Sequence, residues 1–348
     1  MSSDLDQQLA TTLKYHAGGD IDPAPIVEHA RRRGHRLRLR RRWLISGGTA
    51  AACVVLAAAV MVIPAGRAPD GATMPATALV LPDAPGQPGA IARPEVVGAD
   101  PGLVHFTTDS LVSGARSATW STGRGVESVE FRGPTGQARF VLARSAATLD
   151  GLQQTLSSAG RPQPPTDVRV GGRPGVAWFD PSGDTKLWFV RWQPVDGLWA
   201  QLDIYATGHD EATDTASRVR FDAAHRCVVP FRLQLLPPGG RLLGCSVTLF
   251  QSERGSFDDA SLVIGDESGR WLTVRAQPTP GRDPRAADLA AGPYRARRQG
   301  SDVLEMFVTP CVVEAFLKGR GNGYTESEGL TVLSGYQPAG DLDHPDTW

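Results

Sequence analysis

The stretch KLWFVRWQPVDGLWAQLDIY, residues 186–205, carries the main signal for the fold class. It holds two largely apolar runs, 186–192 and 198–205, with proline, aspartate and glycine between them. In the second run every other residue from Leu198 to Ile204 is apolar. Because successive side chains of a strand point to opposite faces of a sheet, this alternation indicates a strand with one buried face. The stretch therefore predicts two strands of a mostly antiparallel sheet.

The same pattern continues on both sides of this stretch. Further strands are predicted at Val126–Phe131, Gln137–Ala143 and Val168–Phe179, each bounded by turn-forming residues. Two segments, Thr148–Ala159 and Asp210–Phe221, are predicted to be helices. Few helices among many short strands are typical of the α+β class.

The region after Gly102 shows signs of internal duplication. Four residues recur at an offset of 125: Phe106, Leu111, Gly114 and Arg116 are matched by Phe231, Leu236, Gly239 and Arg241. The alternative is that both parts share only generic strand spacing. We favour duplication, which predicts two similar, mostly antiparallel α+β units at 102–226 and 228–348. Thr309-Pro310 would suit the start of a helix, but the repeat predicts a strand there.

The N-terminal part predicts a membrane anchor. Eight arginines lie between Arg31 and Arg42, and the next 21 residues, Trp43–Ile63, carry no charge. At about 1.5 Å per residue, a helix of this length spans roughly 31 Å, close to the thickness of a bilayer core. Because arginine beside a span stays on the cytoplasmic side, the N-terminus is expected inside and the bulk of the chain outside. The residues expected to flank the anchor are Arg38, Arg40, Arg41, Arg42 and Trp43.

Two other segments border this predicted single transmembrane helix. Residues 64–101 hold eight prolines, which predicts a Pro/Ala/Gly-rich linker without a core. Residues 1–42 form a basic cytoplasmic tail with a short amphipathic helix at Leu5–Leu13. The tail either only orients the anchor, which we favour, or presents a docking face to a cytosolic regulator. Its charge suits anionic lipid, and no nucleic acid is expected as a partner.

The three cysteines of the external region cannot all pair with one another. If 227–236 and 241–250 formed a hairpin about Pro238-Gly239, Cys227 and Cys245 would lie about 17 Å apart along the strands. A disulfide needs Cα atoms within about 7 Å, so this hairpin excludes a Cys227–Cys245 bond. The preferred prediction is a bond between Cys245 and Cys311, which leaves Cys227 as a free thiol.

Motifs for catalysis are lacking in the sequence. It contains no GxxxxGK[ST] loop, no HExxH helix and no GxSxG elbow, so no catalytic residue and no cofactor are predicted. The weak candidates for a divalent cation are Asp341, Asp343, His344 and Asp346 near the C-terminus. This segment lacks the glycine and terminal glutamate of a calcium loop, and no metal site is predicted from it.

The layout resembles that of a group of actinobacterial single-pass membrane proteins. The matching pieces are Leu5–Leu13, Arg31–Arg42, Trp43–Ile63 and the strand-rich region after Gly102. Such proteins are often encoded beside extracytoplasmic-function sigma factors, so the resemblance implies a regulatory setting. Residues 168–221 are also similar in pattern to PsbP-like α+β units, a likeness of fold that transfers no site. The zinc-binding His/Cys motif of many anti-sigma domains is absent from residues 1–42.

Three functions are compatible with these observations. The first is a non-enzymatic, membrane-anchored envelope protein whose external units bind a ligand or a protein partner. The second is a transmembrane signalling component linked to a sigma factor. The third, an extracytoplasmic hydrolase, is disfavoured because no catalytic motif is present.

Overall fold

The computed structural model describes residues 79–154, 164–180, 186–251, 257–279, 287–317, 323–342 and 344–348. These residues belong to one compact unit, Ala72–Trp348. The predicted tail and the predicted span, Trp43–Ile63, lie outside the described residues. Within the described ranges, no helix has the length and apolar character needed to cross a bilayer.

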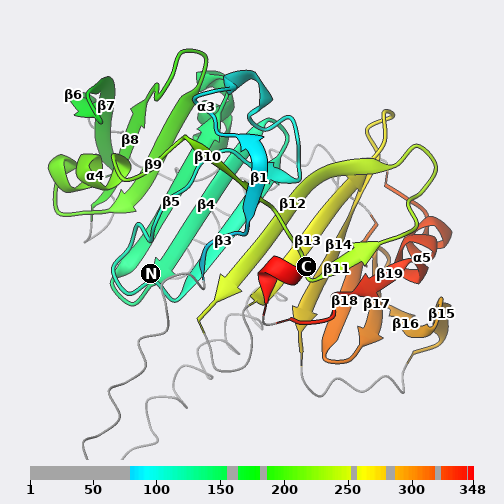
Figure 1. Ribbon diagram of the computed structural model, residues 1–348. Helices are drawn as coiled ribbons and strands as arrows, with labels where there is room; N and C mark the ends of the chain where they lie inside the picture. The colour runs from blue at the N-terminus through cyan, green and yellow to red at the C-terminus, as the bar shows by residue number, and fades with distance from the viewer. Residues whose placement is uncertain are drawn as a thin grey trace, which may run out of the picture. The chain divides into compact units, whose positions relative to one another are not determined.

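A single antiparallel sheet of 14 strands dominates the described part of the chain (Figure 1). One half has the order β3 (Ser117–Gly123), β4 (Val126–Gly133), β5 (Gly136–Ala143), β9 (Trp199–Tyr205), β8 (Leu187–Trp192), β7 (Arg173–Asp180) and β6 (Thr166–Val170). The other half has the order β12 (Arg241–Phe250), β13 (Phe257–Gly265), β14 (Trp271–Pro278), β18 (Cys311–Phe316), β17 (Val303–Val308), β16 (Tyr294–Arg298) and β15 (Leu289–Ala291). In each half, the first three strands lie side by side in chain order, and the last four strands follow them in the reverse of chain order. The halves join where β3 pairs with β12, a junction that we call the seam.

The predicted fold class is therefore wrong. The sequence predicted a transmembrane helix followed by two similar, mostly antiparallel α+β units, whereas the described residues are mostly strand and share one continuous sheet. The seam explains the error, because β3 and β12 pair along seven residues, from Gly123 opposite Gly244 to Ser117 opposite Phe250. This pairing buries the edges that two independent units would have exposed.

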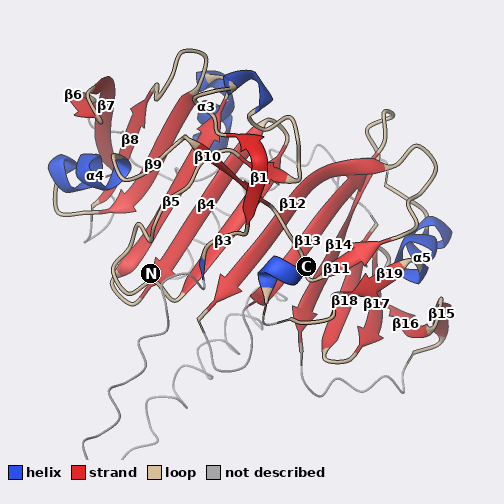
Figure 2. Cartoon of the chain, viewed as in Figure 1, coloured by secondary structure: helices blue, strands red, loops and turns tan. Residues whose placement is uncertain are grey.

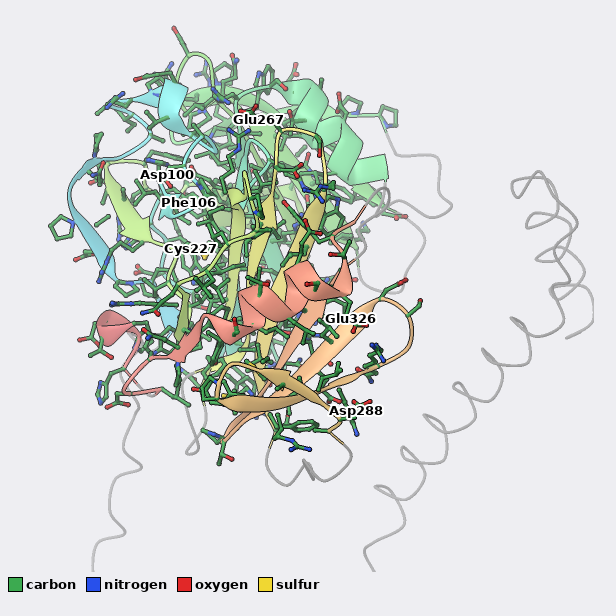
Figure 3. All side chains as sticks on the ribbon, turned by 90° about the vertical axis from the view of Figure 1, so that its right-hand side faces the viewer. Asp100, Phe106, Cys227, Glu267, Asp288 and Glu326 are labelled. Carbon is green, nitrogen blue, oxygen red and sulfur yellow. A yellow bond between two sulfur atoms is a disulfide. The ribbon has the colours of Figure 1, made fainter. Side chains whose placement is uncertain are left out.

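Small elements cover the two faces of the sheet (Figure 2). Three short strands, β1 (Asp83–Pro88), β10 (Ala223–Arg226) and β2 (Leu103–Val104), form a second sheet, and β11 (Phe231–Leu233) pairs with β19 (Tyr336–Pro338). Within the described residues the α-helices are α3 (Ala146–Gln154), α4 (His209–Ala216) and α5 (Glu326–Ser334), with 3-10 turns η2 (Pro94–Val96) and η4 (Pro345–Thr347). In Figures 1 and 3, α3 lies on the face opposite β1 and β10.

The main core lies between the large sheet and the small one. Trp120 on β3 packs against Phe106 with ring centroids 5.7 Å apart, and Phe106 also meets Phe140 on β5 at 4.7 Å. All three side chains are fully buried. Figure 3 places Phe106 and Cys227 on this side of the sheet. Alternate residues of β3, such as Thr119 and Ser121, therefore point to the other face.

The predicted linker is too long. It was expected to run to Pro101 without a core, but Leu79, Leu81, Ala90 and Val97 are buried in the main core. Proline did not prevent this packing, because Pro85 and Pro88 lie in an edge strand and Pro94 begins η2, and proline is tolerated at such positions. The earlier part of the predicted linker, 64–78, lies outside the described residues.

The strands predicted from alternation are confirmed. The segments at 126–131, 137–143, 186–192 and 198–205 correspond to β4, β5, β8 and β9. The predicted run 168–179 is the hairpin β6–β7, which turns at Gly171-Gly172. Cys311–Phe316 is a strand, as the repeat predicted, rather than a helix beginning at Pro310.

Candidate functional site

A line of polar side chains crosses the sheet on the face opposite the main core. It follows register partners from strand to strand, all of them polar except Val141: Arg191, Gln201, Val141, Ser128, Ser121, Ser246, Ser261, Arg275, Glu314, Glu305 and Arg297. Charged residues occupy the two ends of this line, and the four consecutive strands at its centre each contribute a serine. We call Ser128, Ser121, Ser246 and Ser261 the serine row.

A cavity of about 280 Å³ lies over the serine row at the seam. All four serines line it, together with side chains of Val126, Leu152, Leu243 and Val263. The hydroxyls of Ser121 and Ser128 lie 2.8 Å apart and are hydrogen-bonded to each other. The glycine pair Gly123 and Gly244 lets the strands approach at one end, since a Cβ on Gly123 would lie 2.5 Å from the carbonyl oxygen of Leu243. The cavity is therefore built by both halves of the sheet.

Two arginines are the charged residues among those that line this cavity. Arg139 on β5 is half-buried, and Arg124 in the β3–β4 turn is exposed. The backbone of Arg124 has φ of 57°, which is unusual for a residue other than glycine, asparagine or aspartate. Its guanidinium lies 5.1 Å from the ring centroid of Trp271 on β14, so this contact also crosses the seam.

The charged side chains at the two ends of the polar line are paired with other side chains of the protein. In the second half, Arg297 pairs with Glu305 at 2.5 Å, and Arg275 pairs with Asp259. In the first half, Arg191 donates to Gln201 at 2.7 Å and to Asp150 at 2.6 Å. These charges are therefore already engaged within the sheet face or with α3.

Asp203 on β9 is the most perturbed carboxyl group on this face. Burial raises its pKa to about 6, although the Gln201 amide donates to it at 2.7 Å and Arg139 and Arg191 act in the opposite direction. The loss of solvation of the carboxylate thus outweighs its favourable contacts.

Other ionisable groups are buried on the core side. Glu127 accepts hydrogen bonds from the backbone N–H groups of Gly98 at 2.8 Å and His105 at 2.6 Å, and it also contacts His105 Nδ1. His225 on β10 is buried, and this burial lowers the pKa of its imidazole. Because their contacts are internal, we interpret these groups as structural.

The disulfide prediction is wrong. Cys227 is bonded to Cys245 with Cα atoms 6.2 Å apart, and Cys311 is a buried free thiol whose pKa is raised to about 11 by burial. The geometric argument failed because its hairpin does not exist. β12 pairs with β3 and β13, whereas β11 pairs with β19, so Cys227 is free to approach β12 from the core side.

The weak metal candidates do not converge within the described residues. His344 Nε2 lies 3.9 Å from a carboxylate oxygen of Asp341, and both side chains are exposed. Asp346 belongs to η4, and Asp343 lies outside the described residues. Across the described ranges, no group of three or more His, Cys, Asp or Glu side chains is arranged to hold a metal ion. The predicted anchor flank, Arg38, Arg40, Arg41, Arg42 and Trp43, also lies outside the described residues.

The cavity has the chemistry of a binding site. Its lining offers hydroxyls, guanidinium groups and apolar side chains, but no histidine or carboxylate that could accept a proton from a serine. Sequence reasoning missed it because its serines come from two hairpins more than 100 residues apart. The available signal was the similarity of Ser117-Ala118-Thr119 to Ser246-Val247-Thr248, which marks the two strands that meet at the seam.

No protein-family model and no curated protein matches this sequence. The solved structures that show some likeness include the crystal structure of MucB in complex with MucA(peri) and the complex structure of Pseudomonas aeruginosa MucA/MucB. Each match is 14% identical and covers 64% of this chain and 93% of the other, with TM-scores of 0.21 and 0.22. At such TM-scores the likeness supports no conclusion about the fold or function of this chain.

Proposed function

We propose that this protein is a non-enzymatic, extracytoplasmic binding protein that serves as the sensing part of a transmembrane regulatory system. The observation that carries the proposal is the seam cavity, because it has ligand-binding groups and no proton acceptor beside its serines. The position of the cavity at the seam also supports a sensing role. A ligand at the seam touches both halves of the sheet, so binding can be coupled to the arrangement of the whole unit.

The proposed location outside the cytoplasm has two supports. The arginine block before the apolar run Trp43–Ile63 favours an N-terminus on the cytoplasmic side. The Cys227–Cys245 disulfide is typical of proteins that fold in an oxidising compartment. Protease added to intact protoplasts should therefore remove the region after residue 102 and spare residues 1–42. Cleavage of the tail with protection of the sheet would contradict this orientation.

A protein partner is part of the proposal. MucB is described in complex with MucA, and we propose a partner for this chain too, although the support here is its own layout of tail, apolar run and sheet. Residues 1–42 are proposed to engage a cytosolic regulator when the external unit binds its ligand. A sigma factor is the kind of regulator that the resemblance of the layout implies.

A tail exchange tests the regulatory role. The gene is deleted in its host, and the transcript profile is compared after complementation with the full chain or with a chain whose residues 1–30 are replaced by an unrelated soluble sequence. The arginine block is kept in both, so that insertion is matched. We expect only the full chain to restore the profile. Restoration by the exchanged tail would contradict signalling and favour a binding protein confined to the envelope.

A further inference from the structure

We propose that the seam cavity binds the oxyanion of a small organic ligand, a phosphate ester or a carboxylate, through Arg139 and the serine row. This inference rests on the proposed binding function and names the ligand chemistry of the same site. It commits the cavity to an anion rather than to a neutral sugar or a purely apolar ligand.

The first argument is charge. Arg124 and Arg139 are the ionisable side chains that line the cavity, and both are cationic. Within the described residues neither forms an ion pair with a carboxylate at 4.0 Å or less. An oxyanion would receive charge-assisted hydrogen bonds from such a guanidinium, which are about twice as strong as neutral ones.

The second argument concerns the acids beside Arg139. Its register partners are Glu130 on β4 and Asp203 on β9. Glu130 is already paired with Arg132 at 2.5 Å, and Asp203 accepts a hydrogen bond from Gln201 at 2.7 Å. Both carboxylates have other partners, so the guanidinium of Arg139 retains donors for a ligand.

The third argument is the state of the serine hydroxyls. The hydroxyls of Ser121 and Ser128 bond to each other, whereas the hydroxyls of Ser246 and Ser261 make no hydrogen bond to other described residues. These two lie opposite each other on β12 and β13 and both line the cavity. Two neighbouring hydroxyls can donate to two oxygens of the same anion.

The fourth argument concerns the size of the ligand and the apolar group that carries the oxyanion. The volume of about 280 Å³ is just below the range of about 300–1,000 Å³ that is usual for small-molecule sites, so the ligand must be small. Side chains of Val126, Leu152, Leu243 and Val263 also line the cavity, and they can cover a ring or a short aliphatic chain. The ligand is therefore an organic oxyanion rather than a bare inorganic ion.

Saturation-transfer NMR on the full chain in detergent micelles tests the proposal with three probes. Phenyl phosphate and benzoate carry the two candidate anions on one ring, and benzyl alcohol is the neutral comparison. We expect at least one anion to bind in the millimolar range and benzyl alcohol to bind at least about tenfold more weakly. The stronger of the two anions identifies whether phosphate or carboxylate is preferred.

Variants locate the binding. Arg139→Gln should weaken anion binding at least about tenfold, and Arg139→Lys should restore part of it. The double variant Ser246→Ala, Ser261→Ala should weaken binding about three- to tenfold. Arg232→Gln, which removes the same charge from an exposed position on β11, is the matched control and should bind like the parent. Unchanged melting temperatures show that each variant is folded.

Three results would overturn the proposal: no binding of either anion at tens of millimolar, equal binding of benzyl alcohol, or an equal loss in Arg232→Gln and Arg139→Gln. None of these results affects the tail-exchange experiment, which tests the regulatory role through the transcript profile and uses none of the three probes. Failure of the oxyanion site and failure of the proposed function can therefore be told apart.

Discussion

The carboxylate of Glu127 on β4 lies 2.6 Å from Nδ1 of His105, and both side chains are almost completely buried. The same carboxylate accepts the backbone N–H groups of His105 and Gly98. It therefore ties the segment that follows η2 to the large sheet. These contacts satisfy the buried N–H of His105 and the part-buried N–H of Gly98, and leaving such donors without partners is costly.

Replacing Glu127 should therefore destabilise the folded unit. We expect Glu127→Ala to lower the free energy of unfolding by about 3–5 kcal/mol, because the carboxylate and its three contacts are lost together. Glu127→Gln keeps an acceptor oxygen and should lose less. Urea unfolding followed by tryptophan fluorescence measures both. Equal losses in the two variants would show that the acceptor is not what stabilises this site.

The Cys227–Cys245 bond should contribute to stability by closing a loop of 18 residues in sequence separation. The chain-entropy model predicts a loss of about 3 kcal/mol when it is removed. We expect Cys227→Ala, Cys245→Ala to show this loss in urea unfolding, whereas Cys311→Ala should lose less. Mass-spectrometric mapping without reduction should find peptides 227 and 245 linked. A linked pair of 245 and 311 would contradict the structure.

Asp203 should make stability depend on pH. Its pKa is about 6 in the folded protein and has an ordinary value of 3.8, so the folded state binds the proton more tightly. Stability from this group is therefore complete below about pH 4 and is lost as the pH rises through 6. Two pKa units at about 1.4 kcal/mol each set an upper limit of about 3 kcal/mol.

The variant Asp203→Asn cannot ionise and keeps an oxygen that can accept from Gln201. We expect the difference in unfolding free energy between this variant and the parent to change in favour of the variant between pH 4 and pH 7. Because all other groups are shared, their titration cancels in that difference. Parallel pH curves for the two proteins would mean that Asp203 is ionised throughout in the folded state.

What the sequence predicts correctly is local. Strands such as β9 follow from alternation between neighbouring residues, and α4 follows from the acids at its start. The seam cannot be predicted from such local patterns. Its register partners, Ser121 and Ser246, are far apart in the sequence, and only the folded topology brings them together. For the same reason the cysteine argument failed. It took the nearest strand as the partner of β12, whereas that strand pairs with β19, about 100 residues further on.

The N-terminus of α5 offers a last test, because side-chain hydrogen bonds define where this helix begins. Thr325 Oγ1 accepts the backbone N–H of Glu328, and the Glu328 carboxylate accepts the backbone N–H of Thr325 at 2.7 Å, which is a capping box. We expect Thr325→Ala to cost about 1 kcal/mol in urea unfolding. Thr331→Ala is the matched control, because the hydroxyl of that exposed mid-helix threonine donates back to the Ser327 carbonyl, and alanine there should change stability by less than about 0.5 kcal/mol. If both variants lose the same amount, the cap contributes nothing beyond what any exposed threonine side chain of α5 contributes.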